Sequence, residues 1–172
     1  MTLNRIPLAT GLLLVAFLMQ EAFINRISFF LGGFAFYLAF SIAWILKEDR
    51  NSALIIGFIS GLIADLSPTL EAPFGLWTFV MTSFAFVLVN YVRGAFDSNL
   101  SPLSLSFFTS IGATVALLSF FVCGSILGQE VASLNVLFRE LIGNALWSFV
   151  LAPIYIPIAV RTHQLSLTAR ER

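Results

Sequence analysis

The chain has 172 residues, of which 59% are hydrophobic and only 10% are charged, and its mean hydropathy is +0.96. This composition leaves too little polar surface to cover a water-soluble globule, and it predicts a protein embedded in a membrane. Nine basic and nine acidic side chains cancel, which excludes the basic surface that nucleic-acid binding requires.

Six apolar runs predict six membrane-crossing helices, because one crossing takes about 20 helical residues. The expected fold class is all-α: a polytopic integral membrane bundle in a single transmembrane domain over residues 1–172. Residues 161–172 form a short basic cytoplasmic tail in this interpretation. No small-residue cleavage site follows the first run, so we interpret it as an uncleaved crossing. The expected helices cover residues 6–23, 27–46, 52–66, 73–92, 103–127 and 137–160.

The lysines and arginines predict the orientation of the bundle, since cytoplasmic loops hold the excess of these residues. With the amino terminus inside, seven basic residues lie on the cytoplasmic side and two on the outer side. Both termini are therefore expected in the cytoplasm, and the loop that carries Glu71 faces outward. The seven are Arg5, Lys47, Arg50, Arg93, Arg161, Arg170 and Arg172, and the two are Arg26 and Arg139.

Small residues recur along the third expected helix. Gly57, Gly61 and Asp65 are spaced four residues apart and form one stripe, while Ser60 and Ala64 form a second stripe beside it. Helices in lipid associate through close packing and hydrogen bonds, and small side chains let two backbones approach. These residues are therefore predicted to be helix-packing positions, with the third helix buried in the bundle.

The acid at the end of this helix needs partners, because a charge in a membrane segment is costly. One interpretation is structural: Asp65 caps the turn into Ser67 and Pro68 or accepts hydrogen bonds from the loop. The other is functional, with Asp65 contacting a partner or ligand. Glu71 precedes the fourth helix, where the helix dipole favours an acid, and Pro73 suits its first turn.

Polar residues elsewhere in the apolar runs also allow two interpretations. Asn90, Asn144 and the adjacent Arg139 and Glu140 could line a passage. Polar contacts between helices are common, however, at about 0.6 kcal/mol each, and we expect these residues to hold helices together. The residues on the outer side that could line a vestibule are Asp65, Glu71, Glu130 and Arg139.

The sequence does not assemble a catalytic constellation. It has no nucleotide-binding loop, no close pair of carboxylates and no serine with a plausible base. Cys123 and His163 are the only residues of their kinds, which excludes an intrachain disulfide and a multi-histidine or Cys/His metal site. We therefore expect neither an enzyme nor a bound cofactor or metal.

Three features follow one another between Gly57 and Gly75. They are a glycine-rich helix, the run Gly61-Leu62-Ile63-Ala64-Asp65-Leu66, and a proline loop that closes in Pro73-Phe74-Gly75-Leu76. In this order they resemble the MreD family of rod shape-determining proteins. The specific match is confined to this segment, whereas the length and the number of crossings agree over the whole chain.

The resemblance implies a membrane-embedded adaptor, or scaffold, of the bacterial cell-wall elongation complex that is needed for rod shape and its regulation. It implies a multi-pass protein of the bacterial cytoplasmic (inner) membrane. The implied partners are an MreC-like membrane protein, MreB, RodA, a transpeptidase and the lipid bilayer, with no nucleic acid.

The MreD family is also similar in fold to the substrate-binding subunits of energy-coupling-factor vitamin transporters, which makes such a subunit the alternative function. An adaptor needs exposed helix faces and polar residues in turns. A transporter subunit needs polar groups from several helices that converge on an outward cavity. The sequence holds few such groups, and we expect the adaptor.

Overall fold

The computed structural model describes residues 5–68, 72–92, 101–129 and 133–166, and within them the fold is all-helical, as predicted. A short 3₁₀ turn, η1 (Ile24–Arg26), follows the first helix, and a π-helical turn, η2 (Leu88–Val92), extends the fourth. The α-helices are α1 (Arg5–Ala22), α2 (Phe36–Ile45), α3 (Arg50–Ala64), α4 (Leu76–Val87), α5 (Pro102–Ile126), α6 (Leu134–Val150) and α7 (Ala152–Ser166).

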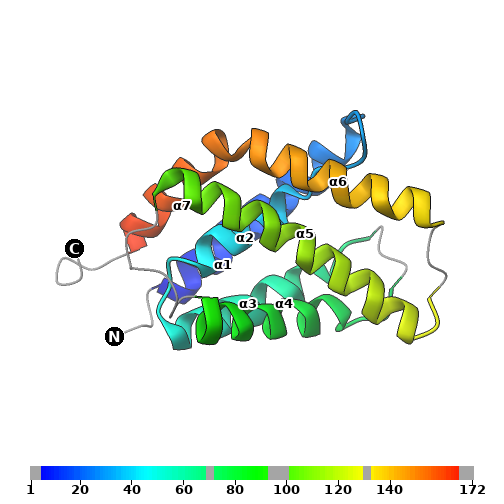
Figure 1. Cartoon of the computed structure of the whole chain (residues 1–172). Helices are drawn as coiled ribbons and strands as arrows, with labels where there is room; N and C mark the ends of the chain where they lie inside the picture. The colour runs from blue at the N-terminus through cyan, green and yellow to red at the C-terminus, as the bar shows by residue number, and fades with distance from the viewer. Residues whose placement is uncertain (1–4, 69–71, 93–100, 130–132, 167–172) are drawn as a thin grey trace.

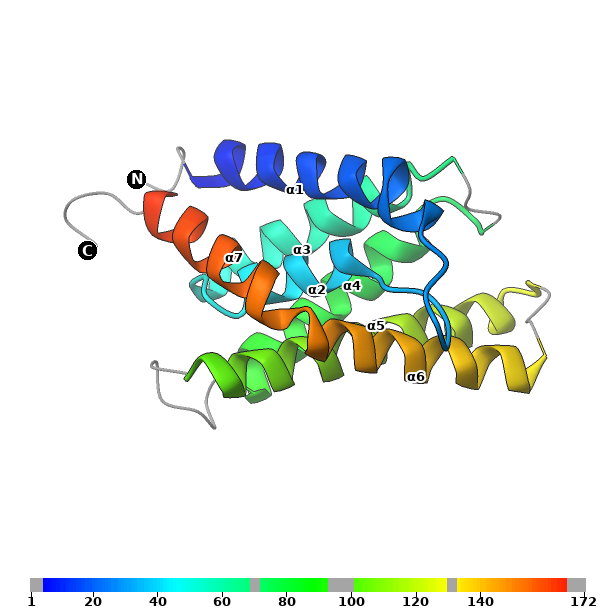
Figure 2. The same cartoon turned by 90° about the horizontal axis from the view of Figure 1, so that it is seen from above.

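The helices form a bundle with two distinct ends (Figure 1). α1 begins and α7 ends at one end, where the connection between α2 and α3 also lies (Figures 1 and 2). The opposite end holds η1, the end of α3 and the start of α4. α2 is the central helix, and nine of its ten residues, Tyr37 to Ile45, are buried.

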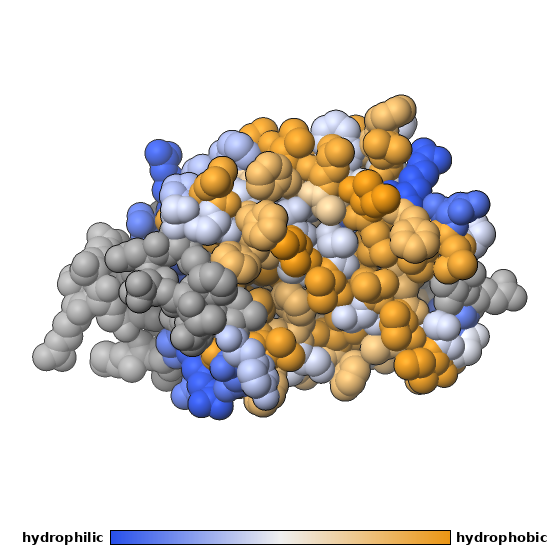
Figure 3. Space-filling view, viewed as in Figure 1, coloured by the Kyte–Doolittle hydropathy of each residue, from blue (hydrophilic) through white to orange (hydrophobic). Residues whose placement is uncertain are grey.

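Two helices are long and apolar enough to cross a membrane, namely the segment Ile6–Arg26 and α5. α6 and α7 meet at a bend of 65° and could together form a third span. α2, α3 and α4 are shorter apolar helices. Figure 3 shows a broad apolar band between hydrophilic residues at the two ends of the bundle. The described residues thus support a membrane protein with two or three possible spans, and the six crossings stay a prediction.

The second expected helix, residues 27–46, is shorter in the structure. Residues 27–35 form an irregular segment, and α2 begins only at Phe36. Leu31 and Gly32 have φ angles of 66° and 100°, and two successive left-handed residues cannot continue a right-handed helix. The expected helix was wrong here because the run carries no proline, and its one interruption, Gly32-Gly33, lies where the structure leaves the helix.

The last expected helix, residues 137–160, is divided in two. Leu151 lies between α6 and α7, and Pro153 follows it. Proline has no N–H to continue the ladder, and its ring clashes with the preceding turn, which accounts for the bend of 65°. α7 then continues to Ser166, so residues 161–166 of the predicted tail are helical. Residues 167–172 lie outside the described part of the chain.

The beginning of α3 also differs slightly from the prediction. The third expected helix begins at residue 52, whereas α3 begins at Arg50. Asp49 is the N-cap, and its carboxylate accepts the N–H of Ser52 at 3.5 Å. Asp, Asn and Ser are all favourable at this position, so the sequence alone does not decide between them.

Candidate functional site

α3 and α4 form the most extensive helix pair of the bundle, and they meet along the glycine stripe. A methyl group on Gly57 would lie 2.5 Å from Cβ of Ala85. One on Gly61 would lie 2.5 Å from Cα of Thr78 and from the carbonyl oxygen of Trp77. Carbon atoms in contact stay about 3.5–4.0 Å apart, so only glycine fits. At these two positions the backbones of α3 and α4 touch directly.

Asp65 ends α3, and its carboxylate caps the beginning of α4. Oδ1 accepts the N–H of Trp77 at 2.9 Å. Oδ2 accepts the N–H of Thr78 at 3.0 Å and its hydroxyl at 2.6 Å. The first N–H groups of a helix have no partner inside it, and the N-cap residue of α4, Gly75 (φ 98°), has no side chain to offer. Asp65 supplies the missing cap from the neighbouring helix, and the positive end of α4 favours its charge.

The turn after Asp65 makes different contacts from those expected. Because α3 and α4 lie side by side, the start of α4 is closer to the carboxylate than the turn into Ser67 and Pro68 is. The hydroxyl of Ser67 instead donates to Oε1 of Glu21 at 2.8 Å, and Pro68 is exposed. Glu71 and Glu130 lie outside the described residues, so the predicted set of outer residues is described only in part.

The second small stripe of α3, Ser60 and Ala64, lies beside α2. The hydroxyl of Ser60 donates to the carbonyl of Gly57 at 2.9 Å, and its own carbonyl accepts the hydroxyl of Tyr37 at 2.7 Å. Ala64 is buried and lines a cavity together with Tyr37. One face of α3 thus contacts α4, and the neighbouring face contacts α2.

An apolar groove of about 570 Å³ lies between the start of α4 and the end of α5. The four residues in which the predicted proline loop closes, Pro73 to Leu76, form part of its wall. In a membrane, such a groove is an ordinary lipid-facing surface, because acyl chains fill it without loss of hydrogen bonds. The lining residues are Pro73, Phe74, Gly75, Leu76, Phe79, Cys123, Ile126 and Leu127.

Side chains of α6 bind the irregular segment 27–35. Oε2 of Glu140 accepts the N–H of Gly33 at 2.8 Å, and Oδ1 of Asn144 accepts the N–H of Ala35 at 3.0 Å. A backbone outside a regular helix leaves N–H groups that other elements must satisfy. These two residues do so, in agreement with the expected role of holding elements together.

Two further residues of α6 complete this contact. The indole N–H of Trp147 donates to the carbonyl of Phe30 at 2.9 Å. Gly143 lies directly against the carbonyl of Leu31, where no larger side chain has room. The segment therefore rests on the helix backbone itself. We refer to these four residues, Glu140, Gly143, Asn144 and Trp147, as the α6 clasp.

Gln20 of α1 caps the start of α2 from the other side. Its Oε1 accepts the N–H of Tyr37 at 3.2 Å, and its Nε2 donates to the carbonyl of Phe34 at 3.1 Å and to Oδ1 of Asn25 at 2.5 Å. Together with Asn144, this amide provides acceptors for two backbone N–H groups at the beginning of α2, those of Ala35 and Tyr37. The central helix can therefore begin inside the bundle.

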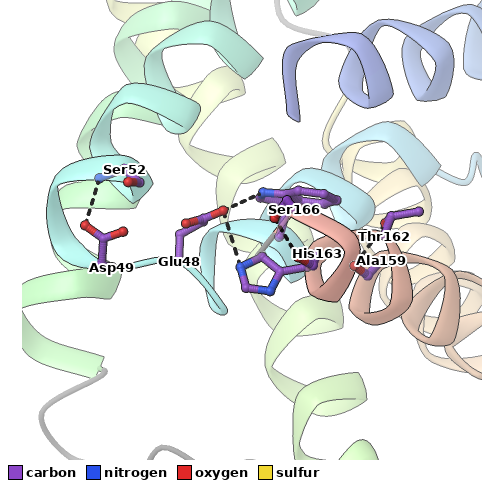
Figure 4. Close-up of polar contacts among 8 residues, drawn as sticks. Glu48, Asp49, Ser52, Ala159, Thr162, His163 and Ser166 are labelled. Carbon is purple, nitrogen blue, oxygen red and sulfur yellow. Dashed lines mark hydrogen bonds and ion pairs between the residues drawn. The ribbon is translucent and has the colours of Figure 1, made fainter. Parts of the chain in front are cut away.

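A buried acid lies at the other end of the molecule (Figure 4). Glu48 is fully buried, and its Oε1 accepts the indole N–H of Trp44 at 3.1 Å. The same oxygen lies 3.3 Å from Nε2 of His163 in α7. The ring of His163 also meets that of Trp44 edge to face at 5.5 Å. This arrangement joins the end of α2 to the end of α7 and buries the histidine that was expected in a basic tail.

Sequence reasoning missed Gln20, Glu21, Glu48 and the position of His163. Gln20 and Glu21 left a signal, because they are adjacent polar residues near the end of an otherwise apolar run. The pairing of Glu48 with His163 left none, since Glu48 lies in the connection between α2 and α3 and His163 lies in α7, far away in sequence. In the described part of the chain, no group of three or more His, Cys, Asp or Glu residues could hold a metal ion.

Comparison of the chain with family models, with curated proteins and with solved structures finds no match.

Proposed function

We propose that this protein is a membrane-embedded adaptor of the bacterial cell-wall elongation complex, in the role of the MreD family that its Gly57–Gly75 segment resembles. In this proposal it crosses the cytoplasmic membrane six times, with both termini in the cytoplasm. It does not act as an enzyme. It connects an MreC-like membrane protein to MreB, RodA and a transpeptidase.

The observation that carries the proposal is the use of Asp65 inside the fold. Its two carboxylate oxygens accept three hydrogen bonds from Trp77 and Thr78, and Gly57 and Gly61 bring the same two helices into backbone contact. The segment that carries the resemblance therefore builds a rigid helix pair. Rigidity of this kind suits a scaffold that presents fixed surfaces to its neighbours.

Exposed apolar faces on the outer helices also support an adaptor. α1, α5 and α6 each present large apolar side chains away from the bundle. In a bilayer these faces contact lipid or pack against helices of other proteins. Examples are Leu18, Phe107, Ile126, Leu134 and Phe138.

One observation favours the alternative, a vitamin-binding transporter subunit. A cavity lined by polar and aromatic side chains lies at the end of the bundle where α3 ends and α4 begins, and its volume is about 160 Å³. Sites that enclose drug-sized ligands measure about 300–1,000 Å³. The cavity is too small for a vitamin, and for this reason the adaptor remains the preferred function.

Depletion combined with capture separates the two functions. Depletion in the host bacterium should give rounded cells, and the purified protein should retain an MreC-like partner but bind no vitamin. Asp65→Asn should reduce capture only as far as it reduces the folded fraction. Normal rod shape after depletion, together with saturable vitamin binding, would favour the transporter subunit.

Topology reporters test the six crossings separately. Reporters at both termini should lie in the cytoplasm, and a tag inserted after Ser67 should lie outside, because basic residues gather in the cytoplasmic loops. Termini on opposite faces of the membrane would exclude an even number of crossings.

A further inference from the structure

The cavity of about 160 Å³ lies where α1 and α3 end and where α2 and α4 begin. Four helices and the turn after α3 contribute to its wall, and Leu117 of α5 closes it on one side. A dry, apolar cavity of about 150 Å³ holds a molecule the size of benzene. This cavity therefore has room for a small head group, and its wall determines which one. The lining residues that carry the argument are Phe17, Gln20, Glu21, Tyr37, Ser67 and Trp77.

Glu21 gives the wall an acidic group. It lies within the candidate membrane span Ile6–Arg26 and is half-buried. Among the described residues, its carboxylate has one partner, the hydroxyl of Ser67, at 2.8 Å. A hydroxyl donor does not neutralise a charge, and an ionisable residue inside a membrane segment calls for a counter-charge. No basic residue is found among the described residues that line the cavity.

The helix ends around the cavity add to the negative potential. The N-terminus of α4 faces the carboxylate of Asp65, and that of α2 faces the amide oxygens of Gln20 and Asn144. Two backbone N–H groups at the start of each of these helices thus have acceptors. α1 and α3 end at the same place, and the C-terminus of a helix carries a partial negative charge of about half a unit. With Glu21, the two negative ends favour a cation.

Three aromatic side chains, Phe17, Tyr37 and Trp77, line the same cavity as this acid. Phe17 meets Tyr37 edge to face at 5.6 Å. Trp77 stacks on Phe120 at 4.2 Å, which fixes its indole ring in place. The faces of aromatic rings attract cations by about 0.5–2 kcal/mol, and such cages recognise quaternary ammonium groups. An acid among fixed aromatic rings is selective for an organic cation over a neutral molecule of the same shape.

We propose that this cavity binds a small organic cation, with an ammonium head beside Glu21 and its carbon atoms against Phe17, Tyr37 and Trp77. Two sources offer this chemistry, a dissolved amine and the head group of an aminophospholipid. The proposal is independent of the adaptor function, because it needs no protein partner.

The test is equilibrium dialysis of radiolabelled choline against the full chain in nanodiscs of phosphatidylglycerol. Choline should bind saturably, and an excess of its neutral isostere 3,3-dimethyl-1-butanol should not displace it. Glu21→Gln should weaken binding by about tenfold or more, because it removes the charge that the cation meets. The fold should survive, since a glutamine oxygen still accepts the hydroxyl of Ser67. Glu21→Asp, which keeps the charge, should retain saturable binding.

Asp49→Asn is the matched control. It removes one acidic charge at the opposite end of the bundle and keeps the capping ability of the side chain at the start of α3, so choline binding should not change. Equal binding to wild type and Glu21→Gln, with both folded by thermal melting, would overturn the proposal. Displacement by the neutral isostere would overturn it as well.

Nanodiscs that contain phosphatidylethanolamine distinguish the two sources. Choline binding that is weaker in these discs than in phosphatidylglycerol discs assigns the site to the lipid head group, which then competes for the cavity. Equal binding in both assigns it to a dissolved amine. No saturable binding in either kind of disc would refute the cation site, and it would leave the adaptor function untouched.

Discussion

The junction of α3 with α4 and the contact of the α6 clasp with residues 27–35 face the same physical problem. In both places a helix begins among apolar neighbours. Its first N–H groups have no partner inside the helix, and side chains from another element must accept hydrogen bonds from them. At the junction, Asp65 alone accepts three hydrogen bonds. At the start of α2 the task is shared, since Glu140, Asn144 and Gln20 accept one backbone N–H each.

The number of acceptors that cap each helix predicts how each region responds to substitution. A cap that depends on one carboxylate is lost in a single substitution, whereas a shared set of acceptors is weakened one bond at a time. The junction also rests on backbone contact at Gly57 and Gly61, so it tolerates added volume poorly. Substitutions at the junction should therefore cost more than those at the clasp.

The largest effect is expected for Gly61→Leu. The added side chain would meet the backbone of Thr78 and Trp77 at 2.5 Å, and overpacking costs about 1–3 kcal/mol, or more where a backbone must move. We expect loss of most folded protein, measured by thermal melting in mild detergent. Gly11→Leu is the matched control, because nothing lies within 4 Å of a methyl group there. Equal melting of both variants would show that α3 and α4 do not touch.

A large effect is also expected at Asp65. Asp65→Leu leaves the N–H groups of Trp77 and Thr78 without acceptors, at about 1–3 kcal/mol for each buried group. Asp65→Asn keeps one acceptor oxygen and should lose about half as much. Unfolding in a graded series of denaturing detergent gives the free energies. Stability of the leucine variant equal to that of the asparagine variant would contradict a capping role.

Asn144→Ala should affect only one bond of the shared set. It leaves the N–H of Ala35 without an acceptor, at about 1–3 kcal/mol. Hydrogen exchange should become faster at Ala35 and stay unchanged at Trp77. The control is Asn90→Ala, because the Asn90 amide donates only to Phe86 in its own helix. Faster exchange at both Ala35 and Trp77 would mean that the two regions unfold together.

The same contrast explains what the sequence could predict. The all-helical fold follows from the apolar runs, and the small-residue stripes of α3 could be recognised because they repeat every four residues. The sequence identifies Asp65 as a residue that needs partners. It does not predict that these partners are Trp77 and Thr78, because their position depends on how α3 and α4 pack.

The clasp was beyond such reasoning for a different reason. Residues 27–35 are apolar and read as helix, and their irregular conformation depends on Glu140 and Asn144, which lie more than 100 positions along the chain. Gly32-Gly33 permits a departure from the helix, but the residues that hold the segment in its irregular conformation lie on a distant helix. The burial of Glu48 against His163 has the same origin, since long-range contacts overrode local composition.

The smallest effect is expected for Trp147→Phe. This change removes one indole N–H, which donates to the carbonyl of Phe30 at 2.9 Å, and keeps the aromatic contact with Phe29. A single hydrogen bond contributes about 0.5–1.5 kcal/mol, and the three other residues of the α6 clasp are unchanged. We expect no measurable change in melting but faster hydrogen exchange at Gly33, because the segment is held at one point fewer. A loss of stability as large as that of Asp65→Leu would mean that Trp147 alone holds the segment, and the clasp would then resemble the junction instead of contrasting with it.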